Sequence, residues 1–138
     1  MDEDLCFLSA AEAGQKIASK ELSSTELTTA LLARTDAIDG NLHAYIRLLR
    51  DEALASAKAA DKAIANGDIK GPLHAVPVAL KDIIDLQGAH TTAHSKLLLD
   101  NIATADAFVT SKLKHAGAVI TGKLATHEFA IGGPAFDL

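Results

Sequence analysis

The chain contains very little cysteine and few aromatic residues. Cys6 is the single cysteine in 138 residues, tryptophan is missing, and aromatic residues make up 4% of the sequence. One cysteine cannot close a disulfide within the chain, so we expect a reducing compartment and a cytoplasmic protein. Cys6 follows an acidic N-terminus that disfavours a thiolate, which makes it a poor nucleophile.

Positive charge and long hydrophobic runs are also lacking. The formal net charge is −5, which argues against direct binding of nucleic acid. No apolar stretch approaches the ~18 residues of a membrane-spanning helix, and the acidic start does not resemble a signal peptide. What is present is an apolar content of 49%, mainly Ala, Leu, Ile and Val. This composition is typical of an α/β protein with one packed core.

Helical and strand patterns alternate along the chain. Two capping boxes, Ser9 to Glu12 and Ser23 to Glu26, mark helix starts. The expected helices are residues 10–19, 24–38, 51–65 and 105–115, and the expected strands are residues 45–48, 77–80 and 118–121.

The last of these helices should turn Phe108, Val109 and Leu113 inward. The strand–helix–strand order from residue 77 onward predicts two parallel strands with a right-handed crossover. Two parallel strands are too few for a stable sheet, so the chain resembles part of a larger fold.

Two familiar site patterns are rejected. Residues 117–123 read GAVITGK and match GxxxxGK, but the four middle residues are themselves an expected strand, and Leu124 stands where a P-loop needs Ser or Thr. His90 and His94 have a helical metal-ligand spacing, but Thr91 and Thr92 between them favour extended chain. We therefore expect no metal and no cofactor.

Lys81 stands at the end of an apolar strand in GPLHAVPVALKD, residues 71–82. A lysine in this place is either a solvated strand end or an amine desolvated by neighbours such as Val78 and Leu80. Desolvation lowers the pKa of a lysine and would make a neutral general base available. The local pattern leaves both interpretations open.

Four ordered motifs resemble those of the amidase signature family. They are GPLHAVPVALKD at 71–82, TTAHS at 91–95, the DAFV, Leu113 and AGAV pattern over 106–119, and GK, HEFA and a glycine over 122–132. The resemblance implies an α/β/α fold, with helices around a mixed, largely parallel sheet that is incomplete in this chain. Residues 1–70 would form an N-terminal helical region and residues 71–138 the start of the signature core.

The same resemblance implies a Ser–cis-Ser–Lys mechanism of amide hydrolysis. Lys81 falls on the family's catalytic lysine, which acts as general base for the nucleophilic serine through a second serine. The Gly/Ser-rich segment that supplies both serines and the oxyanion hole should follow residue 138. The chain is thus expected to be the N-terminal quarter or third of an amidase and to be inactive alone.

Glu128 and Phe129 match a stretch that runs beside the acyl pocket in the family, although packing of a helical turn explains them equally well. Lys123 is expected to be a strand-end lysine rather than the base. Ala75 and His94 replace family glycines, and Ala75 should have ordinary backbone dihedrals.

Two alternatives stay open beside the serine amidase acting on a small amide. One is the glutaminase subunit of a tRNA-dependent amidotransferase, which passes ammonia to partner subunits. The other is a non-catalytic remnant or interaction module. The expected protein partners are a second copy of the chain or amidotransferase subunits.

Overall fold

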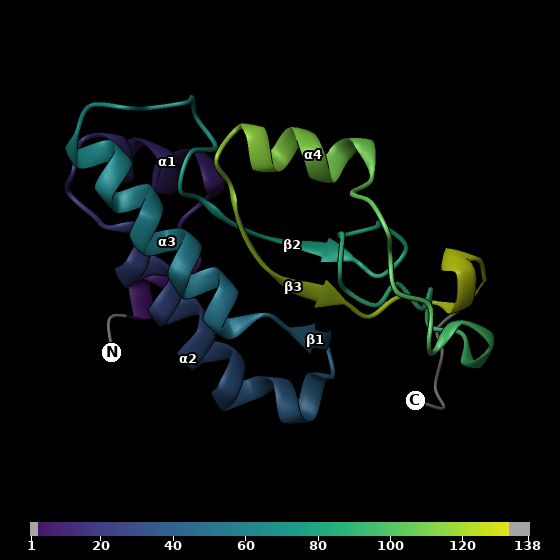
Figure 1. Cartoon of the computed structure of the whole chain (residues 1–138). Helices are drawn as coiled ribbons and strands as arrows, with labels where there is room; N and C mark the ends of the chain where they lie inside the picture. Colours follow the sequence, from purple (N-terminus) through teal and green to yellow (C-terminus); the bar gives the residue numbers. More distant parts are fainter. Residues whose placement is uncertain (1–2, 133–138) are drawn as a thin grey trace.

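The computed structural model of the chain describes residues 3–132 as a small sheet with helices packed around it (Figure 1). The α-helices are α1 (Ala10–Ala18), α2 (Ser24–Leu42), α3 (Arg50–Ala65) and α4 (Phe108–His115). The strands are β1 (Tyr45–Leu48), β2 (Pro77–Lys81) and β3 (Val119–Leu124), and the 3-10 helices are η1 (Glu3–Phe7), η2 (Lys96–Leu98) and η3 (Glu128–Ala130). The α/β class is confirmed.

Both expected capping boxes are present. The Ser9 hydroxyl accepts the N–H of Glu12, and the Glu12 carboxylate accepts the N–H of Ser9 at 2.8 Å. Ser23 and Glu26 repeat the arrangement at the start of α2. Hydrogen bonds from these serines lower the pKa of both glutamates, because they favour the charged carboxylate.

Helix α2 is longer than the sequence pattern predicts. Residues 39–41 were expected to end it, but it continues to Leu42 and ends at His43, which takes a left-handed conformation with φ 50°. The Asp39 carboxylate accepts the N–H of Ala44 at 2.8 Å, just beyond the helix end. A residue expected to break the helix therefore stabilises its C-terminus.

The sheet has the strand order β1-β3-β2, with β3 in the middle (Figure 1). Strands β2 and β3 are parallel, as expected, and β1 is antiparallel to β3, so the sheet is mixed. The register places Leu80 beside Lys123 and Lys81 beside Leu124. The carboxyl ends of β2 and β3 therefore lie side by side at the same end of the sheet.

Small side chains allow α3 to pack closely on β3. Ala53 and Ala57 are fully buried against Val119. A second cluster, on the side of α4, joins Leu80 and Ile120. A third cluster joins α1, α2 and α3 and consists of Ala13, Ile17, Leu22, Leu27, Ala60, Ile64 and Ala75.

Helix α4 differs from the expectation in its start and its buried face. It begins at Phe108, and Phe108 and Val109 are 79% and 46% exposed rather than inward. Thr110 is fully buried instead, and its hydroxyl donates to the Asp85 carbonyl at 2.7 Å. This polar contact sets the rotation of the helix, and Leu113 alone of the three predicted residues packs on the core.

Ala75 contradicts the expectation of ordinary backbone dihedrals. Its φ is 67°, and His94, at the other replaced glycine, has φ 57°. Ala75 is held there by two hydrogen bonds: its N–H donates to Gly117 at 2.8 Å, and its carbonyl accepts from the Ser24 hydroxyl at 2.6 Å. The surrounding structure thus imposes a conformation that usually favours glycine.

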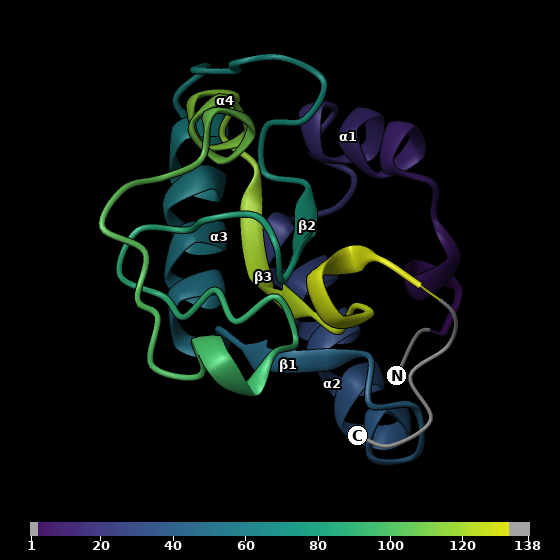
Figure 2. The same ribbon diagram turned by 90° about the vertical axis from the view of Figure 1, so that its right-hand side faces the viewer.

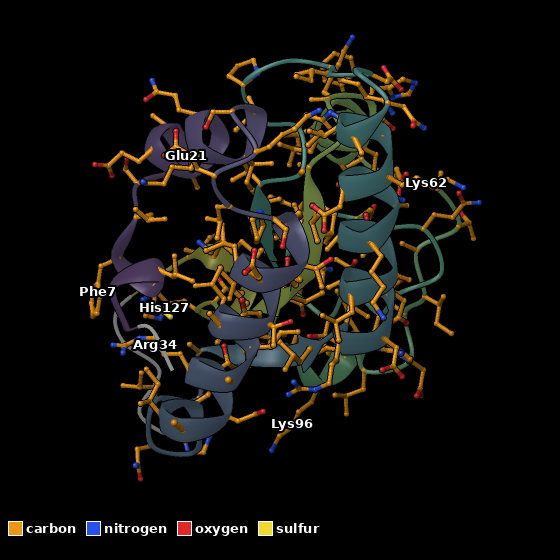
Figure 3. All side chains as sticks on the ribbon, turned by 90° about the vertical axis from the view of Figure 1, so that its left-hand side faces the viewer. Phe7, Glu21, Arg34, Lys62, Lys96 and His127 are labelled. Atoms are coloured by element: carbon orange, nitrogen blue, oxygen red, sulfur yellow. The ribbon has the colours of Figure 1, made fainter. Side chains whose placement is uncertain are left out.

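The N-terminal 3-10 helix η1 is attached to α2 by an aromatic contact. The Arg34 guanidinium lies 4.7 Å from the centroid of the Phe7 ring, and Figure 3 shows the two residues next to one another. In such a cation–π contact, the positive guanidinium is attracted to the negative face of the aromatic ring. None of the helices over residues 3–132 is long and apolar enough to cross a membrane.

Candidate active site

Lys81 and Lys123 stand near the carboxyl ends of the two parallel strands and face opposite sides of the sheet. Lys123 is paired with Leu80, which is buried, and Lys81 follows Leu80 on β2. Because successive residues of a strand alternate between faces, Lys81 points away from Lys123. The two lysines therefore have different environments.

The Lys81 side chain is exposed. Within residues 3–132 it takes part in no ion pair and no side-chain hydrogen bond that the structure records. Leu80 faces the interior and does not cover it. The desolvation that the sequence interpretation required from Val78 and Leu80 is therefore not supplied by these neighbours.

Lys123 contradicts the interpretation as a solvated strand-end lysine. It lies inside β3, its side chain is 0% exposed, and its ammonium forms an ion pair with Asp82 Oδ1 at 2.9 Å. The Asp82 side chain is also buried, at 1% exposure. A fully buried lysine needs such a partner, because an uncompensated charge is costly in the interior.

The remaining donors of Lys123 are also occupied. Its Nζ donates to the Thr91 hydroxyl at 2.9 Å and to the His90 carbonyl at 3.1 Å. An ammonium has three N–H groups, and Asp82 takes the third. Lys123 is a saturated cation and has no free position from which to act on a substrate.

Asp82 uses all of its polar groups. Its N–H donates to the Leu124 carbonyl at 2.9 Å, and its own carbonyl accepts the N–H of Ala93 at 2.9 Å. Its Oδ2 accepts the N–H and the hydroxyl of Thr92, at 3.0 and 2.5 Å. The residue directly after Lys81 is thus joined to β3 and to the 91–93 segment.

Glu128 and Phe129 both lie in the η3 turn, which contacts the segment of residues 93–95. Glu128 Oε1 accepts from the buried Ser95 hydroxyl at 2.7 Å, and the Phe129 N–H donates to the Ala93 carbonyl at 2.8 Å. Figure 2 shows the η3 turn, in yellow, beside the end of β3. Phe129 is 47% exposed, which leaves its ring accessible to a ligand.

Left-handed backbone is concentrated where the 91–95 segment meets the η3 turn. The positive-φ residues there are Ala93, His94, Phe129 and Ala130. Non-glycine residues held in this region cost free energy and persist only where neighbouring structure fixes them. Such strain is typical of functional sites, and the contacting turns stand beside the strand ends that carry the lysines.

The sequence reasoning missed the Asp82–Lys123 pair. One signal was available: each strand was expected to end near a charged residue, and parallel neighbours bring such ends together. The rejection of the P-loop match agrees with the structure, because Gly122 and Lys123 lie inside β3 rather than in a loop. No three His, Cys, Asp or Glu side chains of the described residues gather as a metal site.

A mixed sheet with a lysine at the end of a parallel strand, preceded by GPLHAVPVAL, agrees with the fold that the amidase-signature motifs imply. The chain belongs to the amidase family, whose model matches residues 26–135.

Relatives and solved structures agree with this family. A glutamyl-tRNA(Gln) amidotransferase subunit from Geobacter sulfurreducens is 50% identical over 129 residues, which cover 94% of this chain and 26% of the relative. The corresponding protein from Streptomyces coelicolor is 46% identical, with the same coverage. The chain therefore spans about a quarter of the length of these relatives.

Among solved structures, the native peptide amidase of Stenotrophomonas maltophilia is 36% identical, with a TM-score of 0.82 over 89% of this chain and 26% of that one. A fatty acid amide hydrolase is 30% identical, with a TM-score of 0.84 over 90% of this chain and 22% of that one. The amidase-signature fold is thereby confirmed for the part that this chain covers.

Proposed function

We propose that this chain is the N-terminal part of a serine amidase that hydrolyses a carboxamide by acyl transfer, with Lys81 as its general base. We call the full-length protein that contains these 138 residues the parent enzyme. One observation carries the proposal. Lys81 is exposed, lies within the family motif, and is followed by Asp82, which is held by hydrogen bonds on both sides.

In this proposal the two serines come from the part of the parent enzyme that follows residue 138. A neutral Lys81 amine takes up the proton of the nucleophilic serine through the cis-serine, and the serine attacks the amide carbonyl. Backbone N–H groups stabilise the resulting oxyanion. Lys81 then returns the proton to the leaving amine, and water hydrolyses the acyl-enzyme.

The exposure of Lys81 in this chain has a place in the proposal. Burial lowers the pKa of a lysine, and a neutral amine is required for general-base catalysis. The remaining part of the parent enzyme would have to cover Lys81 to provide that burial. Residues 1–138 alone, without cover and without the serines, should hydrolyse no amide.

The test replaces Lys81 in the parent enzyme. General-base catalysis is worth about 10² to 10⁴ in rate, so Lys81→Ala should lower kcat/KM for an amide substrate by at least the lower figure. Lys114→Met is the control, because Lys114 pairs with Asp106 on the surface at 2.7 Å, and its loss should leave the rate unchanged. A near-normal rate for Lys81→Ala would contradict the assignment.

A second candidate is supported by the names of the relatives. The curated relatives at 43–50% identity are amidotransferase subunits, whereas the peptide amidase is 36% identical. In this alternative the parent enzyme releases ammonia from glutamine for a partner subunit. Glutamine hydrolysis that rises on addition of amidotransferase partner subunits would favour this alternative. Hydrolysis of simple amides at a rate that partner subunits do not change would favour the amidase.

The non-catalytic alternative is tested most simply from the gene. Sequencing the coding DNA beyond codon 138 should reveal an in-frame Gly/Ser-rich segment with both serines. A stop codon at that point would favour a remnant or interaction module.

A further inference from the structure

The buried Asp82–Lys123 pair is not explained by stability alone. Both side chains are at most 1% exposed, and their charged atoms lie 2.9 Å apart. Removing two charges from water is costly, and replacing such a pair by apolar residues is often neutral or stabilising. Strand β3 itself contains buried apolar residues such as Val119 and Ile120, so a hydrophobic pair could have served here.

The pair fixes the backbone that carries Lys81. Asp82, the next residue, is bound to β3 through its N–H and its Oδ1. Before Lys81, strand β2 is hydrogen-bonded to β3. After it, the Lys81 carbonyl accepts the N–H of Ile84 at 2.9 Å. The main chain at Lys81 is therefore restrained from both directions, while its side chain is free of such contacts among the described residues.

The same pair also reaches the turns on the Lys123 side. Lys123 donates to the Thr91 hydroxyl, and Asp82 Oδ2 accepts from Thr92. The next residue, Ala93, accepts the N–H of Phe129. One buried charge pair thus joins the backbone beside Lys81 to the 91–95 segment and, through that segment, to the η3 turn.

We propose that Asp82 and Lys123 are positioning residues, which hold the Lys81 backbone in the one orientation that directs its amine toward the reacting serines. This inference rests on the proposed function, in which Lys81 is the base. A misplacement of about 1 Å can cost about 10²-fold in rate, so a rigid attachment of the Lys81 backbone has a direct catalytic value. Lys123 itself is not a second base, because its three N–H groups are occupied.

The experiment is a double-mutant cycle in the parent enzyme. Asp82→Asn keeps the shape of the side chain and removes its charge. We expect kcat to fall about 10²-fold while KM stays within about threefold, because substrate binding does not use Asp82. In the Lys81→Ala background, the same substitution should lower kcat by less than about twofold, since a residue that acts only through Lys81 has nothing left to position.

Two further variants keep the test decisive if Asp82→Asn folds poorly. Asp82→Asn combined with Lys123→Met removes both charges and should recover the thermal midpoint of the parent enzyme while kcat stays low. Thr92→Val keeps both charges and removes one hydroxyl from Asp82 Oδ2, which should lower kcat by about three- to tenfold. Lys114→Met breaks an exposed ion pair and should change neither background.

The outcomes separate the two proposals. Equal losses in the Lys81 and Lys81→Ala backgrounds would mean a purely structural role and overturn the positioning inference. Full kcat in the charge-free double variant, or in Thr92→Val, would overturn it as well. If Lys81→Ala alone keeps a near-normal rate, the proposed function fails, whatever Asp82 does.

Discussion

His74 occupies the space that a glycine leaves open. Its ring is 4% exposed and lies against Gly117, where an added Cβ would be 2.3 Å from His74 Cδ2. The Lys70 N–H donates to His74 Nδ1 at 3.2 Å, so the neutral ring carries its proton on Nε2. His74 therefore has a structural role, because its buried ring fills the space beside Gly117.

The environment of His74 predicts a dependence of stability on pH. Burial lowers the pKa of His74, the Lys70 charge lowers it further, and Asp68 acts in the opposite direction. The unfolded chain then binds more protons than the folded one, so this contribution to stability is present above the unfolded pKa of about 6.5 and is lost as the pH falls through the folded pKa.

The measurement is the urea midpoint of the parent enzyme between about pH 7.5 and pH 5, where histidines titrate. We expect the parent enzyme to lose more stability over this range than His74→Asn, which retains an acceptor for Lys70 and does not titrate. Identical pH profiles for the two proteins would contradict the assignment.

At this scale the sequence predicted the place of Lys81 and failed for Lys123. The strand pattern and the motif locate Lys81 at the end of β2. The burial of Lys123 depends on Asp82 and on the 91–92 segment, and their contact arises only when β2 and β3 are side by side. A sequence window around one strand does not show which residue of the other strand lies beside it, so the pair could be inferred only by comparing the ends of both strands.

At the scale of elements, α1 packs closely on the loop before β2. An added Cβ at Gly14 would lie 2.3 Å from the Pro72 carbonyl oxygen. Gly40 is also helical, in α2, but has no atom within 4 Å of its added Cβ. The two glycines therefore offer the same substitution in opposite surroundings.

Alanine should act with opposite signs at these positions. Gly40→Ala should stabilise the parent enzyme by about 0.5–1 kcal/mol, because alanine has the higher helix propensity. Gly14→Ala should destabilise it by about 1–3 kcal/mol, since the helix or the loop must move. Urea unfolding of both variants checks this pair, and stabilisation by Gly14→Ala would show that the contact is readily relieved.

Local chemistry also explains which elements were predictable. The starts of α1 and α2 depend on a serine and a glutamate three residues apart, so the sequence alone was sufficient. The rotation of α4 depends on a hydrogen bond from Thr110 to Asp85, a residue of a distant loop, and could not be read from its apolar periodicity.

At the scale of the whole molecule, the described part presents many apolar side chains to solvent. Among residues 3–132, β1 and β2 each pair along one side only, because β3 takes the middle of the sheet. The large hydrophobic residues that are exposed are Phe7, Leu42, Ile46, Ile69, Ile83, Leu97, Leu99, Ile102, Phe108, Val109, Phe129 and Ile131. Open edges and apolar patches promote association.

We therefore expect purified residues 1–138 to self-associate at micromolar concentration. Analytical ultracentrifugation should detect oligomers, and Leu97→Glu with Phe108→Glu should reduce them, because these side chains are 86% and 79% exposed. Ala55→Glu with Ala59→Glu adds the same charge on the exposed face of α3 and is the matched control. A monomer with a single cooperative unfolding transition would contradict the expectation.

The central place of β3 has a consequence for the order of folding during synthesis. β3 is the last of the three strands to leave the ribosome, and both β1 and β2 need it as their partner. The helices can form from local contacts much earlier, but neither β1 nor β2 can pair in this sheet until residues 119–124 have emerged. The nascent chain therefore carries two unpaired strands until β3 emerges, and this interval is when chaperone binding would matter most.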